Sequence, residues 1–363
     1  MYVKPWIKDI VRVGGQQGRA GFLRLDMNEN PGGLPADFVE DVKRELTPEY
    51  LAMYPEESRC LDLLAGYLTA EAGLEKGPAS IGVNNLCLTN GSDMAIRYLY
   101  EVYAKKGSTV VTVAPSFEMY RIYSLVFGLN HRPVIYHDDF TLPVEEILEA
   151  IQEDTDIVVL LNPNNPVGRA YTDDEFERIT DRAAEVGALV IVDEAYHYFY
   201  KKTFLREALG KDHVVVIRTF SKLMSLAGCR MGFMVAAPQL IEYVKHVRPS
   251  FEVNTVALKF AEKLLERPEL IDEMQKEAEE GKRYLLTSLK DAGYDVMERE
   301  GNFIFVRPRF QEAAKAADRL EHEKHVLVKT YGAPLLKDYL RISTGARCYM
   351  EQFLEAFYEV DCR

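Results

Sequence analysis

The stretch DIVVLLNPNNPVGRAYTDDEFERITDRAAEVGALVIVDEAY, residues 156–196, decides the fold. It begins with a run of apolar residues, and a second apolar run occupies 188–192. Neither run alternates apolar with polar residues, which is typical of strands that are buried on both faces of a sheet. Between the two runs, Thr172 and Glu175 have the spacing of a capping box at a helix start. Three apolar residues behind this box share one helical face: Phe176, Ile179 and Ala183. The order of strand, helix and strand predicts a parallel pair of strands with a crossover helix.

The same alternation continues on both sides of this stretch. TVVTV at 109–113 and HVVVI at 213–217 are further buried-strand candidates. We therefore expect an α/β fold with a mostly parallel central sheet flanked by helices. Beyond about residue 255 the pattern changes to long charged helices, and short strand candidates follow at 302–306, 325–328 and 339–343. These elements predict a smaller C-terminal α+β domain.

The organisation along the chain follows from these patterns. The expected parts are an N-terminal arm that packs with the small domain (1–35), a large domain (36–248) and a small C-terminal domain (249–363).

Composition restricts the classes of partner. The chain has 363 residues, of which 47% are hydrophobic and 28% charged, and a formal net charge of −13. This charge disfavours nucleic acid and anionic membrane surfaces, and no apolar run approaches the length of a membrane span. The cysteines are odd in number, widely spaced and without a C-x-x-C pair, which predicts reduced thiols and a cytoplasmic location. We expect no nucleic-acid partner, no membrane partner and no metal; His322 and His325 lack further clustered ligands.

Polar motifs follow several of the predicted strands. At 90–100, NGSDMAIRYLY reads either as a helix start whose free amides bind a phosphate or as a plain N-cap. NPNNPVG at 162–168 reads either as a ligand-binding loop at the carboxyl edge of the sheet or as a turn. Asp193 at a strand end could bind a cationic ring nitrogen or be structural. The glycine motifs of P-loop and dinucleotide-binding proteins are absent.

A lysine in an apolar setting is the most unusual feature. In RTFSKLMSLAGCR, residues 218–230, Lys222 stands among apolar residues, with Ser221 before it and Arg230 eight residues after it. A lysine that is shielded from water loses its preference for the charged form, so its amine becomes a nucleophile near neutral pH. The hydroxyls of Thr219 and Ser221 and the guanidinium of Arg230 are suited to binding an anion.

Together these motifs carry a resemblance. NPNNPVG, VDEAY, RTFSKLMSLAGCRMGF and LRISTG occur in an order and spacing that resemble the fold-type I pyridoxal-phosphate aminotransferases, and most of all the histidinol-phosphate aminotransferase family, over nearly the whole chain. The resemblance implies pyridoxal 5'-phosphate as the cofactor and a role in amino-acid biosynthesis.

The resemblance also implies a role for each matching residue. Lys222 would form a Schiff base with the cofactor and then act as general base and acid. Asp193 would pair with the pyridinium nitrogen, and Asn165 and Tyr196 would bond to the phenolic oxygen of the ring. Phe117 would stack on the ring. The residues expected at the cofactor phosphate are Ser92, Asp93, Ser221, Arg230 and, from the neighbouring chain of a homodimer, Tyr54.

The substrate residues follow in the same way. Arg341 resembles the family arginine that binds the substrate α-carboxylate, and Asn28 would lie over the substrate. Where the family usually has tyrosine and arginine to bind a substrate phosphate, this chain has Trp6 and Lys329. Lysine still binds phosphate as a point charge, whereas the indole is bulkier and mostly apolar.

We therefore expect an aminotransferase that moves an amino group from an L-amino acid or amino alcohol phosphate, with histidinol phosphate the first choice, to 2-oxoglutarate in ping-pong fashion. Two alternatives stay open. One is an aminotransferase for an aromatic or otherwise bulky amino acid, and the other is a decarboxylase of the threonine-phosphate decarboxylase type. A cofactor-binding regulator is disfavoured, since no DNA-binding module is attached.

Overall fold

The computed structural model describes residues 1, 3–8, 10, 18–75, 77, 80–200 and 202–362. Its main element is a seven-stranded sheet in the order β2-β8-β7-β6-β5-β3-β4. The strands are β2 (Leu86–Thr89), β3 (Thr109–Ala114), β4 (Asn130–Ile135), β5 (Thr155–Leu161), β6 (Leu189–Asp193), β7 (Val214–Thr219) and β8 (Gly232–Ala236). Strands β4, β3, β5, β6 and β7 pair in parallel, whereas β8 runs antiparallel to both β7 and β2. The expected mostly parallel sheet is confirmed.

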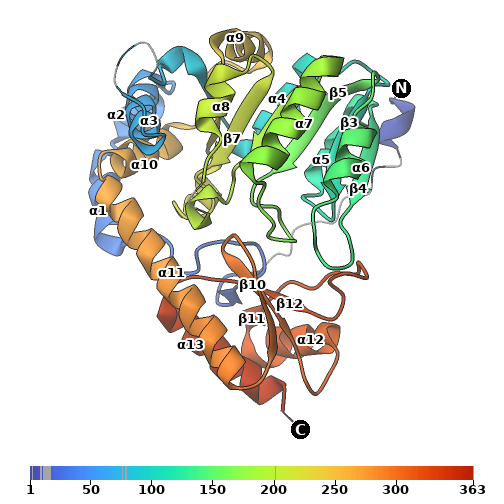
Figure 1. Ribbon diagram of the computed structural model, residues 1–363. Helices are drawn as coiled ribbons and strands as arrows, with labels where there is room; N and C mark the ends of the chain where they lie inside the picture. The colour runs from blue at the N-terminus through green and yellow to red at the C-terminus, as the bar shows by residue number, and fades with distance from the viewer. Residues whose placement is uncertain are drawn as a thin grey trace.

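Helices cover both faces of this sheet, as Figure 1 shows. Alternate residues of the central strands enter two separate cores: Val158 and Val190 pack in one, and Val159 and Ile191 in the other. This two-sided burial explains why the strands read as continuous apolar runs. The helices of the first core include α7 (Asp173–Val186) and α8 (Leu205–Gly210), and those of the second include α4 (Gly91–Tyr103), α5 (Met119–Phe127) and α9 (Pro238–Val247). A further helix, α6 (Val144–Ala150), packs against α7.

The capping box before α7 is present. The Thr172 hydroxyl accepts a hydrogen bond from the Glu175 amide at 3.2 Å, and the Glu175 carboxylate accepts one from the Thr172 amide at 2.8 Å. The helix ends at Gly187, whose φ of +73° is a left-handed conformation that glycine adopts without strain. Sequence and structure therefore agree on where this crossover helix begins.

A second, smaller layer of structure lies below the large sheet in Figure 1. It contains a three-stranded antiparallel sheet in the order β12-β10-β9 and a parallel pair of β1 with β11. These strands are β1 (Leu23–Arg24), β9 (Asp295–Glu298), β10 (Phe303–Arg307), β11 (Val326–Leu327) and β12 (Leu340–Ser343). Helices α12 (Ala313–Lys324) and α13 (Arg347–Val360) pack on them. The three strands predicted in this region are present within one residue.

The connection between the two layers is a long helix. The remaining helices are α1 (Ala36–Glu45), α2 (Pro48–Ala52), α3 (Ser58–Glu71), α10 (Thr255–Leu265) and α11 (Pro268–Asp291). Figure 1 shows α11 running from the large layer to the small one, and its residues enter both cores: Ile271 packs in the large one and Leu285 in the small one. Helix α10 packs wholly in the large core. The division of the chain after residue 248 stays a prediction. No helix in the described part combines the length and apolar character that a bilayer span needs.

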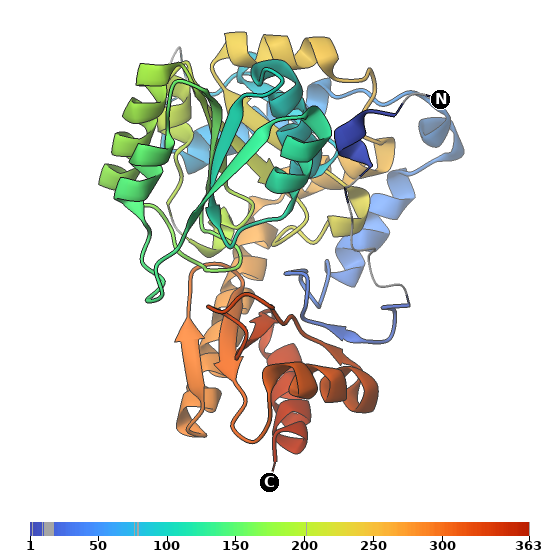
Figure 2. The same ribbon diagram turned by 90° about the vertical axis from the view of Figure 1, so that its right-hand side faces the viewer.

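The N-terminal arm packs in two places. Strand β1 joins β11 and Leu25 is buried in the small core. The 3-10 helix at Pro5–Ile7 lies instead beside α5 on the large layer, where Figure 2 shows it. The Trp6 indole donates to the Val126 carbonyl at 3.1 Å, and its ring lies over Gly128.

Candidate active site

A cavity of about 140 Å³ lies at the carboxyl edge of the large sheet. Its position follows from topology, because β2, β5, β6 and β7 point the same way and their following loops meet at one edge. The lining residues are Ser92, Asp93, Phe117, Leu161, Asn165, Asp193, Ala195, Tyr196, Thr219, Ser221, Lys222 and Arg230. The structure thus brings together all the residues expected at the cofactor except Tyr54.

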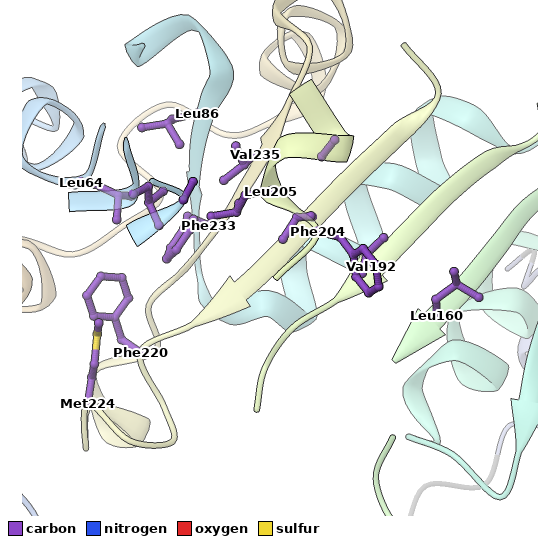
Figure 3. Close-up of a cluster of buried hydrophobic side chains, with 14 of the residues drawn as sticks. Leu64, Leu86, Leu160, Val192, Phe204, Leu205, Phe220, Met224, Phe233 and Val235 are labelled. Atoms are coloured by element: carbon purple, nitrogen blue, oxygen red, sulfur yellow. The ribbon is translucent and has the colours of Figure 1, made fainter. Parts of the chain in front are cut away.

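Lys222 is held in place by its apolar neighbours. Phe220 and Met224 anchor the segment after β7 in the large core, where Figure 3 shows their side chains adjacent. The Lys222 amine donates to the Met27 carbonyl at 2.9 Å. Burial, and next the positive charge of Arg341, lower the pKa of Lys222 to about 8. At neutral pH a useful fraction of this amine is therefore uncharged and nucleophilic.

Asp193 is a buried acid at the end of β6, only 2% exposed. Its two oxygens accept hydrogen bonds from the Tyr120 hydroxyl at 2.8 Å and from the Ala195 amide at 3.0 Å. Burial raises the pKa of Asp193 to about 6, against the lowering effect of the Tyr120 bond. Such a carboxylate gains strongly from a cation placed in the cavity. Tyr120 was missed in the sequence, although it lies one helical turn after Phe117.

The start of α4 and Arg230 also line the cavity, and together they form a cradle whose groups are suited to an anion. Helix α4 starts at Gly91, so the amides of its first turn are free to bind an anion. A Cβ on Gly91 would come within 2.8 Å of the Arg230 guanidinium, and one on Gly232 within 2.5 Å of the Ser92 amide. Glycine at both positions therefore lets Arg230 and the helix start converge. The Thr219 hydroxyl donates to Ser221 at 2.9 Å, so the two hydroxyls named in the sequence lie together.

The predicted substrate residues Arg341 and Asn28 contact side chains that line the cavity. Arg341 is only 4% exposed, and its guanidinium donates to the Asn165 side chain at 2.7 Å and to the Asp26 carbonyl. The side-chain amide of Asn28 donates to the Tyr196 hydroxyl at 3.0 Å. Both residues therefore contact groups that the cofactor was expected to meet.

Lys329 is a neighbour of Arg341. The two residues exchange backbone hydrogen bonds of 3.1 and 2.8 Å across an antiparallel bridge. Residues that face each other in this way carry their side chains on the same side. A second cation is thus placed beside the buried arginine.

Trp6 and Tyr54 lie away from the cavity and from the side chains that line it. Trp6 lies against α5, because the short N-terminal helix packs on the large layer instead of crossing to the cavity. Tyr54 is 77% exposed, stacks on Phe251 with ring centroids 4.6 Å apart, and lines a separate cavity. Within one chain, therefore, neither residue contacts the site.

A buried ionic network lies behind Asp193 and was also missed. Arg218, only 1% exposed, donates to Glu194 at 2.9 Å and to Glu71 at 2.7 Å. Glu194 also accepts from the Phe204 amide at 2.7 Å, and Glu71 pairs with His197 at 2.8 Å. Every charge in the network is paired, which is the condition under which buried ions are tolerated. The network fixes the turn that carries Asp193 and Tyr196.

Comparisons with known proteins agree with this geometry. The family model described as aminotransferase class I and II matches residues 21–357. The histidinol-phosphate aminotransferase 2 of Burkholderia pseudomallei is 35% identical over 330 residues, which cover 90% of this chain and 89% of that protein. The histidinol-phosphate aminotransferase 2 of Nitrosococcus oceani is 32% identical over 365 residues, which cover 98% of this chain and 97% of that protein.

The fold is shared with a solved structure. The crystal structure of the Sinorhizobium meliloti histidinol-phosphate aminotransferase in complex with pyridoxal-5'-phosphate has a TM-score of 0.84 and 22% identity, with 99% of this chain and 97% of that chain covered. The chain therefore belongs to the aminotransferase class I and II family and is a pyridoxal-phosphate-dependent aminotransferase.

Proposed function

We propose that this enzyme moves an amino group from histidinol phosphate to 2-oxoglutarate, with Lys222 as the residue that holds the cofactor covalently and carries the proton. The observation that carries the proposal is that one cavity contains both a lysine of lowered pKa and the buried acid Asp193. The names of the similar proteins support the choice of donor.

The residues of the cavity fit pyridoxal phosphate. The cradle of the α4 start, Ser221 and Arg230 suits the phosphate, and a Cβ at Gly91 would close it. Asp193 suits the ring nitrogen, while Asn165 and Tyr196 suit the phenolic oxygen and Phe117 the ring face. When bound, the cofactor supplies an electron sink for negative charge that develops at the substrate Cα.

The chain's own residues supply the proton and the charges. Lys222 has a pKa of about 8, so its amine can take a proton from the substrate Cα and return it elsewhere on the bound molecule. Asp193, when paired with the ring nitrogen of the cofactor, would keep that nitrogen protonated and positively charged. Burial raises the pKa of Tyr196 to about 12, so its hydroxyl stays protonated and donates a hydrogen bond.

Substrate recognition rests on two cations. Arg341 offers its planar fork to the carboxylate of the acceptor. Lys329 on the same side of the bridge offers a point charge to a second anion. A phosphorylated donor and a dicarboxylate acceptor both carry an anion that such a charge can bind.

A screen of amino donors with 2-oxoglutarate tests the donor. We expect histidinol phosphate to have a kcat/KM about tenfold or more above that of phenylalanine, the equivalent of one charge-assisted contact. Formation of glutamate, followed in a coupled assay, measures it. Lys329→Met provides the matched variant, since it should lower kcat/KM for histidinol phosphate and leave phenylalanine unchanged.

Each alternative has its own outcome in this screen. A preference for phenylalanine would replace the proposal with an aromatic aminotransferase. Release of carbon dioxide from phosphothreonine without formation of glutamate would replace it with a decarboxylase.

The pH dependence of cofactor capture tests the lysine. Only the neutral amine attacks an aldehyde, so the rate at which the apoenzyme binds pyridoxal phosphate should rise with pH and level off near the pKa of about 8. An ordinary lysine would continue to accelerate toward about pH 10.4. Stopped-flow absorbance provides the rates, and a rate that still climbs above about pH 9.5 would argue against Lys222 as the attacking amine.

We further propose a homodimer in which Tyr54 contacts the cofactor phosphate of the neighbouring chain. The proposal is supported by the exposure of Tyr54 (77%) and of its stacking partner Phe251 (54%), which places two aromatic rings at the surface. Sedimentation equilibrium would show a monomer if the dimer proposal is wrong.

A cytoplasmic location is proposed because Cys60 and Cys87 are free and buried, and cell fractionation checks it.

A further inference from the structure

A short segment of the N-terminal arm lies on the active site. This strap, residues 26–30, has neither helical nor strand structure. Three consecutive residues of the strap each contact a different site residue: the Asp26 carbonyl accepts from Arg341, the Met27 carbonyl from Lys222, and the Asn28 amide donates to Tyr196. The strap is therefore placed to control the geometry of all three.

The strap is anchored on both layers of the protein. On the small layer, the backbone amide of Asn28 donates to the Ser343 hydroxyl at 2.9 Å, and the backbone carbonyl of Asn28 accepts from the Asn302 side chain at 3.0 Å. On the large layer, Asn30 donates to the Ser225 hydroxyl at 2.8 Å. Asn28 has a φ of +56°, an uncommon conformation for a residue with a side chain, which these bonds hold in place.

A single arginine ties the two acids of the strap together. The Arg19 guanidinium donates to Asp26 at 2.6 Å and to the two oxygens of Glu29 at 3.1 and 3.0 Å. The Arg24 side chain adds a contact to Glu29 at 3.4 Å. Arg19 is largely buried, with 16% of its side chain exposed, so water screens these contacts only in part. Asp26 and Glu29 flank Met27 and Asn28, the two residues that contact Lys222 and Tyr196. The Arg19 guanidinium therefore bridges the two ends of this pair.

We propose, on the basis of the proposed function, that Arg19 is a positioning residue: with Asp26 and Glu29 it clamps the strap so that the Met27 carbonyl receives the Lys222 amine when that amine is not bound to the cofactor. The clamp also holds the Glu29 carboxylate, whose charge the Arg19 guanidinium compensates, near the amine. Lys222 gains a proton and loses it in each turnover, so the clamp acts on the step that Lys222 performs.

The charges around Lys222 decide what a change in the clamp does. The positive groups are Arg341 from β12 and Arg230 beyond β7, and the negative groups are Glu29 from the strap and Asp193 from β6. The Tyr196 ring lies 5.6 Å from the amine. Glu29 favours the protonated form of Lys222. Loss of Glu29 should therefore lower the affinity of this nitrogen for a proton. Loss of Arg19 should raise that affinity, because Glu29 would keep only its longer contact with Arg24.

The test is a spectral pH titration of the holoenzyme, because the absorbance of the bound cofactor reports protonation of the nitrogen that joins it to Lys222. Arg19→Met is expected to raise the midpoint by about half a pH unit and Glu29→Gln to lower it by a similar amount. Glu29→Asp keeps the carboxylate and should stay near the parent value. Arg19→Met should also lower kcat by about tenfold, as the amine loses its fixed acceptor.

The matched control is Arg178→Met, which removes an arginine that pairs with Glu145 on the surface at 2.6 Å. It should change neither the midpoint nor kcat. Midpoints that do not move in Arg19→Met and Glu29→Gln, or that move in the same direction, would overturn the clamp. A parent enzyme that shows no absorbance from a lysine-bound cofactor would instead overturn the proposed function, so the two failures are distinguishable.

Discussion

Replacement of Lys222 by alanine is expected to abolish amino transfer, with a loss of kcat of about 10³-fold or more. The reason is that one amine both holds the cofactor and moves the proton, and a positioned acid or base alone contributes about 10²–10⁴-fold. The apolar neighbours Phe220 and Met224 stay in the core, so the fold should survive. Glutamate formation at saturating donor measures the loss, and circular dichroism verifies the fold.

The control for this variant is Lys43→Ala, which removes a lysine that pairs with Glu40 on the exposed face of α1. It should retain full activity. If Lys222→Ala kept turnover within about tenfold of the parent enzyme, another base would have to move the proton, and the assignment of Lys222 would fail.

Replacement of Asp193 by asparagine should have the second largest effect, a loss of kcat of about 10²–10³-fold. An amide keeps the volume but carries no charge and has one accepting oxygen, so it retains only one of the two hydrogen bonds from Tyr120 and Ala195. The ring nitrogen of the cofactor would no longer be kept protonated. The electron sink would weaken while the cofactor stays bound. Rates of the half-reaction with donor alone, measured by stopped-flow absorbance, separate this effect from binding of the acceptor.

The comparison variant is Asp156→Asn, which changes an acid that accepts from the Lys105 amide at the surface. Its half-reaction should equal that of the parent. A fast half-reaction in Asp193→Asn would mean that the protein reaches the same charge state of the ring without this acid. The role of Asp193 would then be structural.

The crossover from β5 through α7 to β6 was predictable because its signals are local. Two-sided burial is visible as apolar runs, and a capping box needs only Thr172 and Glu175. The antiparallel strand β8 was not predictable in the same way, since its place between β7 and β2 depends on pairing with β2, which is distant along the chain. Helix α10 reads as one of the charged helices beyond about residue 255, and the partner of its apolar face in the large core becomes visible only in the fold.

The cofactor end of the site was predictable because the loops that follow parallel strands meet at one edge. Tyr120 and the Arg218 network were not, since a buried tyrosine or arginine carries no local signature of its partner. Trp6 and Tyr54 lie away from the cavity of their own chain, and the sequence of one chain does not say whose cavity a residue serves.

The proposed function depends on the Lys222 amine being the covalent attachment point of pyridoxal phosphate. Borohydride reduction of the holoenzyme, digestion and mass spectrometry of the lysine-containing peptides test it most directly. We expect the mass of the reduced cofactor on Lys222 and on no other lysine. An unmodified Lys222 in fully loaded enzyme, or the added mass on a different lysine, would contradict it.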